Sequence, residues 1–135
     1  MTAQTGTGDK AKIIDGKGLA AIERGRTETR VRALRDAGHT VALDAVLISA
    51  GDNASRVYAD NQAKGCEALG ITYRLHELGQ GTTQAELLSQ IRRLNADPAV
   101  TAIMVHMPLP AGIDDDRIKA AIEPEKDVEG VNPAN

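Results

Sequence analysis

The sequence predicts an α/β fold in which helices cover both faces of an open, parallel sheet of three strands or slightly more. Three short aliphatic runs alternate with longer segments whose apolar residues recur at helical spacing. Strands that alternate with helices are joined by right-handed crossovers and therefore pair in parallel. Only 1% of the residues are aromatic, so Val, Ile, Leu and Ala must build the core, which suits a buried sheet.

The 135 residues suffice for one domain of ordinary size. We expect residues 1–11 to form a flexible tail, because the first nine are small and polar and show no periodicity. The domain then covers 12–135. Its first helix is predicted over 16–37 and ends at Gly38. The apolar residues that predict a buried stripe on this helix are Leu19, Ile22, Val31 and Leu34.

The middle of the chain predicts two strands around a second helix. Residues 43–50 are aliphatic and β-branched, and the turn-forming residues 51–53 follow them, as at the end of a buried strand. A helix is predicted over 54–69, where Gly70 stops it. The next strand is predicted over 71–75.

The last third of the chain predicts a helix, a strand and a short helix. Thr82 or Thr83 can cap a helix over 84–95, and the glutamate three residues after Thr83 completes a capping box. Residues 100–105 predict a third buried strand, and a short helix is predicted over 114–122.

Composition excludes several classes of function. Lys and Arg total 16 against 19 Asp and Glu, so the net charge of −3 offers no bulk attraction to phosphate backbones. Two tyrosines without Phe or Trp exclude an aromatic platform for single-stranded nucleic acid. One cysteine allows no internal disulfide and no cysteine-based zinc site. No run approaches the about 20 apolar residues of a membrane span. We therefore expect a cytoplasmic protein without nucleic-acid partner, membrane anchor or metal.

Candidate ligand-binding residues follow two of the predicted strands, since ligands of open α/β sheets bind beyond the carboxyl ends of the strands. Ser55, Tyr58 and Gln62 are spaced by three and four residues, which places them on one face of the second helix. His106 is the only histidine at a strand exit, and the prolines of 106–110 leave backbone groups there free for a ligand. A packed tyrosine and a structural histidine are the alternative interpretations.

Four segments together resemble a known family. They match, in order and spacing, the catalytic domain of methylenetetrahydrofolate dehydrogenase/cyclohydrolase. Their residues are 13–17, Ser55 with Tyr58, 107–113 and 124–130.

The resemblance implies a domain that binds a tetrahydrofolate derivative, methylene- or methenyl-tetrahydrofolate, in a cleft beside a second, nucleotide-binding domain. This sequence contains no Gly-x-Gly-x-x-Gly turn, so we expect no NAD(P) site in this chain. The family commonly dimerises through its second domain. We expect that domain to be absent from this sequence, so the resemblance predicts no oligomeric state. A homo-oligomer or docking on another protein both stay open.

The resemblance also assigns roles to individual residues. Tyr58 matches the tyrosine that stacks on the aminobenzoate portion of folate. Gln62 stands where the family has its catalytic lysine, and His106 stands where a glutamine poises that lysine. Glu129 replaces the aspartate that anchors the pterin ring. By the same resemblance, the set expected to line the folate site also includes Ser55, Val105, Met107 and Pro108.

The expected function is that of a folate-dependent one-carbon enzyme. His106 would supply acid–base chemistry, with Gln62 and Glu129 positioning the ligand, because a glutamine cannot exchange a proton near neutral pH. We expect the one-carbon unit to be opened or transferred, and a small amine is the favoured acceptor. The alternatives are a non-catalytic folate-binding or regulatory module, and the first domain of a longer dehydrogenase/cyclohydrolase.

Overall fold

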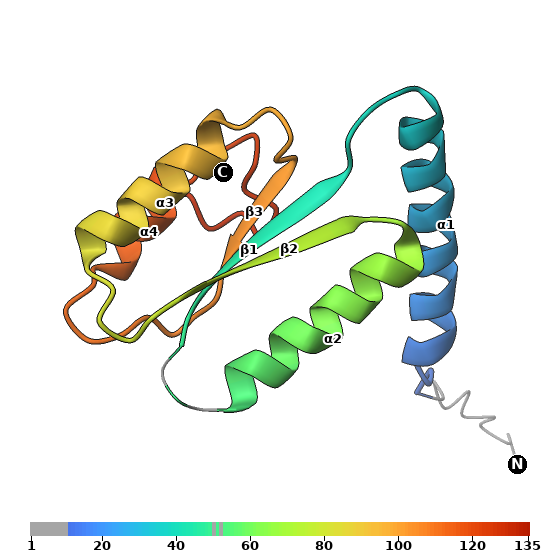
Figure 1. The fold of residues 1–135 in the computed structure, drawn as a ribbon. Helices are drawn as coiled ribbons and strands as arrows, with labels where there is room; N and C mark the ends of the chain where they lie inside the picture. The colour runs from blue at the N-terminus through green and yellow to red at the C-terminus, as the bar shows by residue number, and fades with distance from the viewer. Residues whose placement is uncertain (1–10, 50, 52) are drawn as a thin grey trace, which may run out of the picture.

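The computed structural model describes residues 11–49, 51 and 53–135. Except for Ala11, the predicted tail over 1–11 lies outside the described residues. Helices and strands alternate along the chain as predicted (Figure 1). In order they are α1 (Gly16–Asp36), β1 (Ala42–Ile48), α2 (Asn53–Leu69), β2 (Thr72–Leu78), α3 (Gln84–Ala96), β3 (Ala102–Val105) and α4 (Asp115–Ala121).

The described strands form one parallel sheet in the order β2-β1-β3. The central strand β1 pairs with β2 along its full length, from Ala42 opposite Thr72 to Ile48 opposite Leu78. On the other side it pairs with β3. A single parallel bridge between Ile103 and Asp127 adds the C-terminal segment to the outer edge of β3. The predicted fold class is confirmed.

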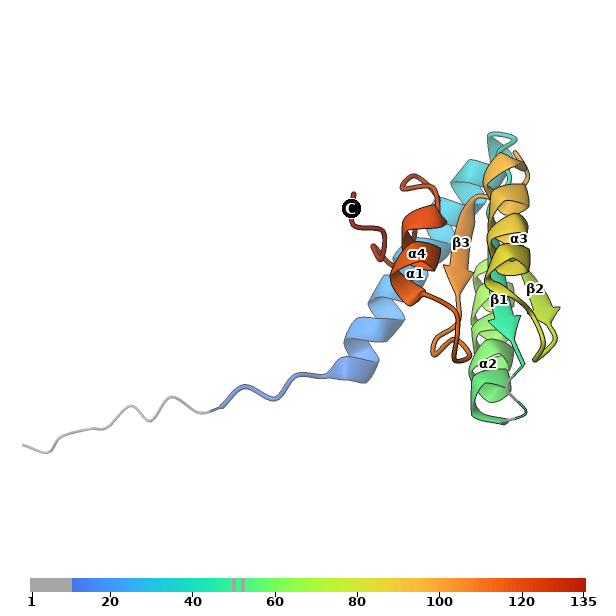
Figure 2. The ribbon, with the colours of Figure 1, turned by 90° about the vertical axis from the view of Figure 1, so that its left-hand side faces the viewer.

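Helices cover both faces of the sheet, with α2 on one face and α3 and α4 on the other (Figures 1 and 2). The hydrophobic core fills the space between the sheet and the α3–α4 pair. Its fully buried members include Leu87 and Ile91 of α3 and Ile118 of α4. Apolar residues three or four apart on these helices make the buried faces that the sequence pattern predicts.

Helix ends follow the predicted signals. Thr83 and Glu86 form the capping box at the start of α3, with each side chain bonded to the other residue's backbone amide. Gly38 and Gly70, just beyond the ends of α1 and α2, have φ of 86° and 77°, a region that L side chains rarely adopt.

The predicted buried stripe on α1 is wrong for three of its four residues. Val31 is buried, whereas Leu19 and Ile22 are each 55% exposed and Leu34 is 45% exposed. The reason is the placement of the helix, which packs mainly on α2 and extends beyond the sheet (Figure 2).

Strand boundaries differ slightly from the prediction. β2 runs on to Leu78 because its polar second half stays in register with β1. β3 starts at Ala102, since Val100 donates its amide to Asp97 O in a turn at 3.1 Å. β1 ends at Ile48, and Ala50 lies outside the described residues.

One charged group is buried in the central strand. Asp44 is 1% exposed and accepts two hydrogen bonds from Arg74 of β2, at 2.8 and 2.7 Å. His76 Nε2 lies 2.7 Å from the same carboxylate. Burial alone would raise the pKa of Asp44, but the hydrogen bonds from Arg74 and His76 outweigh burial and hold it below its usual value.

Candidate functional site

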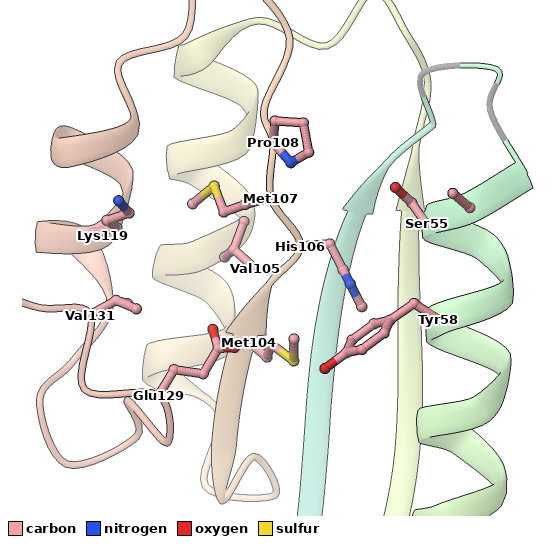
Figure 3. Close-up of a pocket in the computed structure, with 11 residues that line it drawn as sticks. Ser55, Tyr58, Met104, Val105, His106, Met107, Pro108, Lys119, Glu129 and Val131 are labelled. Carbon is pink, nitrogen blue, oxygen red and sulfur yellow. The ribbon is translucent and has the colours of Figure 1, made fainter.

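A cleft of about 620 Å³ opens at the carboxyl end of β3 (Figure 3). One wall is α2, the floor is the end of β3 with the residues that follow it, and the other wall combines α4 with the C-terminal segment. Its volume lies within the about 300–1,000 Å³ typical of small-molecule sites. The structure therefore places a cavity where the topology of an open parallel sheet predicts one.

The α2 wall presents Ser55 and Tyr58 to the cleft. Tyr58 is 57% exposed, so most of its ring area is free for a ligand. The ring meets the imidazole of His106 edge to face, with centroids 5.6 Å apart and planes at 82°. The predicted helix face thus carries Tyr58 to the strand exit that holds His106.

His106 lies at the floor and is only 5% exposed. Its backbone amide donates to Val46 O at 2.9 Å, which continues the sheet pairing one residue beyond β3. Its Nε2 atom has no hydrogen-bond partner among the described residues. Burial lowers the pKa of His106 below its ordinary value of 6.5. The ring is therefore neutral at physiological pH and has a free nitrogen.

Residues next to His106 complete the floor. Val105 lines the cleft and also belongs to the hydrophobic core. Met107 and Pro108, joined by a cis peptide bond, follow at the exit. These three neighbours of His106, which were predicted to line a ligand site, line this cleft.

Gln62 lies one layer behind the surface of the cleft. Its Nε2 donates to the Met104 sulfur at 2.9 Å, and Met104 lines the cleft. Its Oε1 is buried without a partner among the described residues. The predicted residue is therefore adjacent to the cavity, with an amide oxygen free to accept a hydrogen bond, but it is not among the lining residues.

The opposite wall carries Glu129, together with Lys119 and Val131. Partial burial and the negative charge of Asp127 raise the pKa of the Glu129 carboxyl. Figure 3 shows Glu129 near Met104 and across the cleft from Tyr58. The acidic residue and the aromatic residue thus face each other across the cavity.

The turn that carries Glu129 is closed by hydrogen bonds. Asn132 donates its backbone amide to Asp127 Oδ2 at 2.8 Å, and its side chain donates to Ile122 O at 2.8 Å. These bonds tie the turn to the end of α4, and Asn132 is 8% exposed. Asp127 is the acid that orders the turn, whereas Glu129 faces the cleft.

Four lining residues were not predicted from the sequence: Ala54, Met104, Lys119 and Val131. Lys119 had one usable signal. It follows Ile118, the buried residue of α4, so the helical repeat places it beside the face that packs on the core. In the described part of the chain, no group of three or more His, Cys, Asp or Glu side chains could hold a metal ion.

The comparison with known families decides the identity of the domain. The model of the tetrahydrofolate dehydrogenase/cyclohydrolase catalytic domain matches residues 14–129. The chain belongs to this family. The resemblance given by the four segments is confirmed, and the family is one of folate one-carbon enzymes.

Individual curated relatives support this family assignment. The bifunctional protein FolD of Anaeromyxobacter dehalogenans is 46% identical over 123 residues, which are 91% of this chain and 43% of that protein. FolD of Rhodopseudomonas palustris is 45% identical over 126 residues, 93% of this chain and 42% of that protein. The chain thus spans less than half the length of these curated relatives.

Solved structures of the family share the fold. The FolD methylenetetrahydrofolate dehydrogenase/cyclohydrolase of Campylobacter jejuni superposes with a TM-score of 0.85 at 36% identity, covering 89% of this chain and 42% of that one. The methylenetetrahydrofolate dehydrogenase-cyclohydrolase of Trypanosoma brucei, solved with NADP cofactor and inhibitor, superposes with a TM-score of 0.82 at 30% identity. The match covers 93% of this chain and 42% of that one. None of the helices described for this tetrahydrofolate dehydrogenase/cyclohydrolase domain is long and apolar enough to cross a membrane.

Proposed function

We propose that the cleft binds methylene- or methenyl-tetrahydrofolate and that the chain opens or transfers the one-carbon unit. The observation that carries this proposal is the state of His106. It has a buried, neutral imidazole with an unpartnered Nε2 at the floor of a cleft edged by an exposed tyrosine. A buried polar atom without a partner is costly unless a ligand satisfies it.

The residues present fit a folate. Tyr58 offers a ring face for stacking on the aminobenzoate group, and Glu129 would accept hydrogen bonds from the pterin amino group. Gln62 Oε1 is buried behind the lining residues, and a turn of its side chain toward the ligand would let it accept one more. Ser55, Val105, Met107 and Pro108 would shape the site around these polar contacts.

The chemistry proposed for His106 is proton transfer. A bound methylene-tetrahydrofolate supplies an electrophilic carbon. As the nitrogen of an attacking amine bonds to that carbon, His106 Nε2 would take the proton that the amine loses. The same proton would pass to one of the two folate nitrogens when its bond to the carbon breaks, so the ring opens and the imidazole returns to its neutral form. The carbon then joins the amine to the other folate nitrogen. Transfer is complete when this second bond breaks, the amine nitrogen gives its remaining proton to that folate nitrogen, and the carbon leaves as the imine of the amine.

An amine is the favoured acceptor because Gln62 cannot provide the lysine chemistry of the family's cyclohydrolase step. Water is a weaker nucleophile than an unprotonated amine and depends more on assistance. Transfer to an amine, rather than hydrolysis, is thus the variant that the residues favour.

A second candidate rests on the length of the match. Because the chain spans only 42–44% of the curated relatives, the activity of the whole relatives would require the remainder of such a protein. This domain would then supply the folate-binding half of a dehydrogenase/cyclohydrolase. A silent folate-binding module, the cytoplasmic location and an oligomeric or docked state also stay predictions.

The decisive experiment is isothermal titration of the chain with methylene-tetrahydrofolate, repeated with Tyr58→Ala. Micromolar binding that the substitution removes supports the proposal. Absence of binding to the wild-type chain contradicts it. Binding without any change in the ultraviolet spectrum of the folate, in the presence of amines and over several pH values, favours the silent module.

A further inference from the structure

Lys119 is a cation in the cleft to which neither the fold nor the proposed chemistry gives a role. It lies on α4, across the cleft from Ser55 and Tyr58 (Figure 3). Ile118 and Ile122, 0% and 1% exposed, anchor this helix in the core. The position of Lys119 on the wall is therefore fixed by its neighbours in sequence.

A comparison between lysines shows what is unusual about this one. Lys119 and Lys126 are the half-buried lysines among the described residues. The Lys126 ammonium donates to the carbonyls of Leu94, Asn95 and Asp97 at 3.1, 2.8 and 2.9 Å. The Lys119 ammonium has no hydrogen bond or ion pair with any described residue.

Acids at suitable spacing do not pair with it. Asp115 and Asp116 of α4 stand four and three residues before Lys119, the separations at which helical side chains meet. Even so, no ion pair joins any of them to Lys119. The half-buried side chain of Lys119 instead lines the cavity, and no described residue accepts a hydrogen bond from its three ammonium donors.

We propose that Lys119 binds a carboxylate of a ligand seated in the cleft, an inference that rests on the proposed function. The charges of the lining residues favour a singly charged group over a phosphate. Among the lining residues that the structure describes, Lys119 is the one cation and Glu129 the one acid, and His106 is neutral. A compact ammonium with three donors suits a carboxylate as a point charge.

Two sources could supply this carboxylate, and one experiment separates them. The first is the glutamate tail of the folate, and the second is a carboxylate on the amine acceptor. Binding of tetrahydrofolate and of tetrahydropteroate, which lacks the glutamate, is measured for the wild-type chain and for Lys119→Met. Binding of glycine and of methylamine is then measured with tetrahydrofolate at saturation.

If Lys119 holds the tail, the wild-type chain binds tetrahydrofolate about three- to tenfold more tightly than tetrahydropteroate, and Lys119→Met removes this preference. If Lys119 holds the acceptor, Lys119→Met weakens the binding of glycine by a similar factor and leaves the binding of methylamine unchanged. Either result supports the inference, and Lys119→Arg, which keeps the charge, should retain most of the preference.

The controls separate this inference from the proposed function. Lys64→Met removes an exposed lysine that is not in the cleft. It should change neither the ratio of the affinities for tetrahydrofolate and tetrahydropteroate nor the ratio of those for glycine and methylamine. Lys119→Met keeps the aliphatic stem, and a thermal melt checks that it folds. If tetrahydrofolate binds and Tyr58→Ala abolishes that binding, but neither ratio depends on Lys119, the inference alone is wrong. If the wild-type chain binds no tetrahydrofolate, the proposed function and this inference both fail.

Discussion

Tyr58 of α2 and His106 after β3 meet edge to face, with ring centroids 5.6 Å apart. Their elements lie far apart in sequence, and the parallel sheet brings them together because α2 starts, and β3 ends, at the same edge of the sheet. The contact holds the tyrosine ring at the mouth of the cleft while the imidazole stays beneath it.

The first prediction concerns Tyr58. Tyr58→Phe should retain folate binding, because the ring face is kept, whereas Tyr58→Leu should weaken binding at least about tenfold through loss of stacking. The free energy of unfolding should change by less than about 1.5 kcal/mol in both variants, since the side chain is 57% exposed. Calorimetric titration and urea unfolding measure the two quantities. Equal affinities for Phe and Leu would contradict a stacking role.

The lowered pKa of His106 predicts that the free energy of unfolding decreases at acidic pH. Burial lowers its pKa in the folded chain, so folding favours the neutral ring. Its contribution to stability is complete above pH 6.5, and it is lost as the pH falls from there through the lowered folded pKa. An NMR titration of the His106 ring should show a midpoint below 6.5, and His106→Gln should reduce the loss of stability on the acid side. A midpoint at or above 6.5 would exclude the neutral base.

Turnover gives a separate test of His106. His106→Ala should abolish transfer of the one-carbon unit while folate affinity stays within about tenfold, because the acid–base group contributes about 10²–10⁴-fold to rate and little to binding. Stopped-flow spectroscopy of the folate follows the reaction, and titration follows the affinity. An active His106→Ala chain would rule out the assigned role.

Gln62→Lys should introduce hydrolysis of methenyl-tetrahydrofolate. The amide now contacts Met104 and leaves its oxygen buried and unpartnered behind the lining residues of the cleft, so the longer side chain of a lysine would reach the cavity and supply the proton chemistry that glutamine lacks. The rate should rise about 100-fold over the wild-type chain. Gln62→Met, which matches the chain length without a proton-exchanging group, is the control and should show no gain.

Glu129→Gln should stabilise the fold and weaken the binding of the folate. Partial burial and Asp127 raise the pKa of Glu129, so its folded-state contribution is complete below the unfolded pKa near 4.5 and is lost as the pH rises through the raised folded pKa. At neutral pH the ionised carboxylate is therefore a cost that the amide avoids. The melting temperature should rise slightly at pH 7 and stay unchanged at pH 4. A lower melting temperature at pH 7 would contradict the assigned electrostatics.

Asp44→Asn should be the most destabilising of these substitutions. It removes the charge that pairs with Arg74 and His76 in the middle of β1. The cost should be about 2–3 kcal/mol, below that of a fully enclosed pair because the Arg74 side chain is 37% exposed and can reach water. Since the pKa of Asp44 is lowered, its contribution is present above pH 3.8 and lost as the pH falls through the folded value. Urea unfolding at pH 7 and pH 3 measures both effects.

The order and type of the elements were predictable because β1 and β3 are short aliphatic runs, the start of β2 carries a strand pattern, and each helix has a periodic apolar pattern or a capping signal. The capping box of Thr83 and Glu86 marked the start of α3, and the exit at His106 marked the floor of the cleft. These signals are local, and the alternation of strands and helices determines how they combine.

What could not be predicted depends on contacts between distant segments. The face of α1 that carries Leu19 and Ile22 has the pattern of a buried stripe, yet the helix packs on α2 away from the sheet. The polar end of β2 gives no strand signal by itself, and only pairing with β1 keeps it extended. Lys119 enters the cleft because α4 packs on the core through Ile118. The sequence places Lys119 beside that apolar residue but does not show which elements the helix packs against.

The bridge between Ile103 and Asp127 has a consequence for solubility in crowded conditions. A strand at the border of a sheet offers unpaired amides and carbonyls to other molecules, and β3 is such a strand. Ile103 donates its amide to Lys126 O at 2.8 Å, so the chain's own segment occupies part of that border and excludes a foreign strand. The same segment leads directly into the turn of Glu129. Resistance to aggregation and the shape of the cleft thus depend on one short stretch of chain, and damage to one would damage the other.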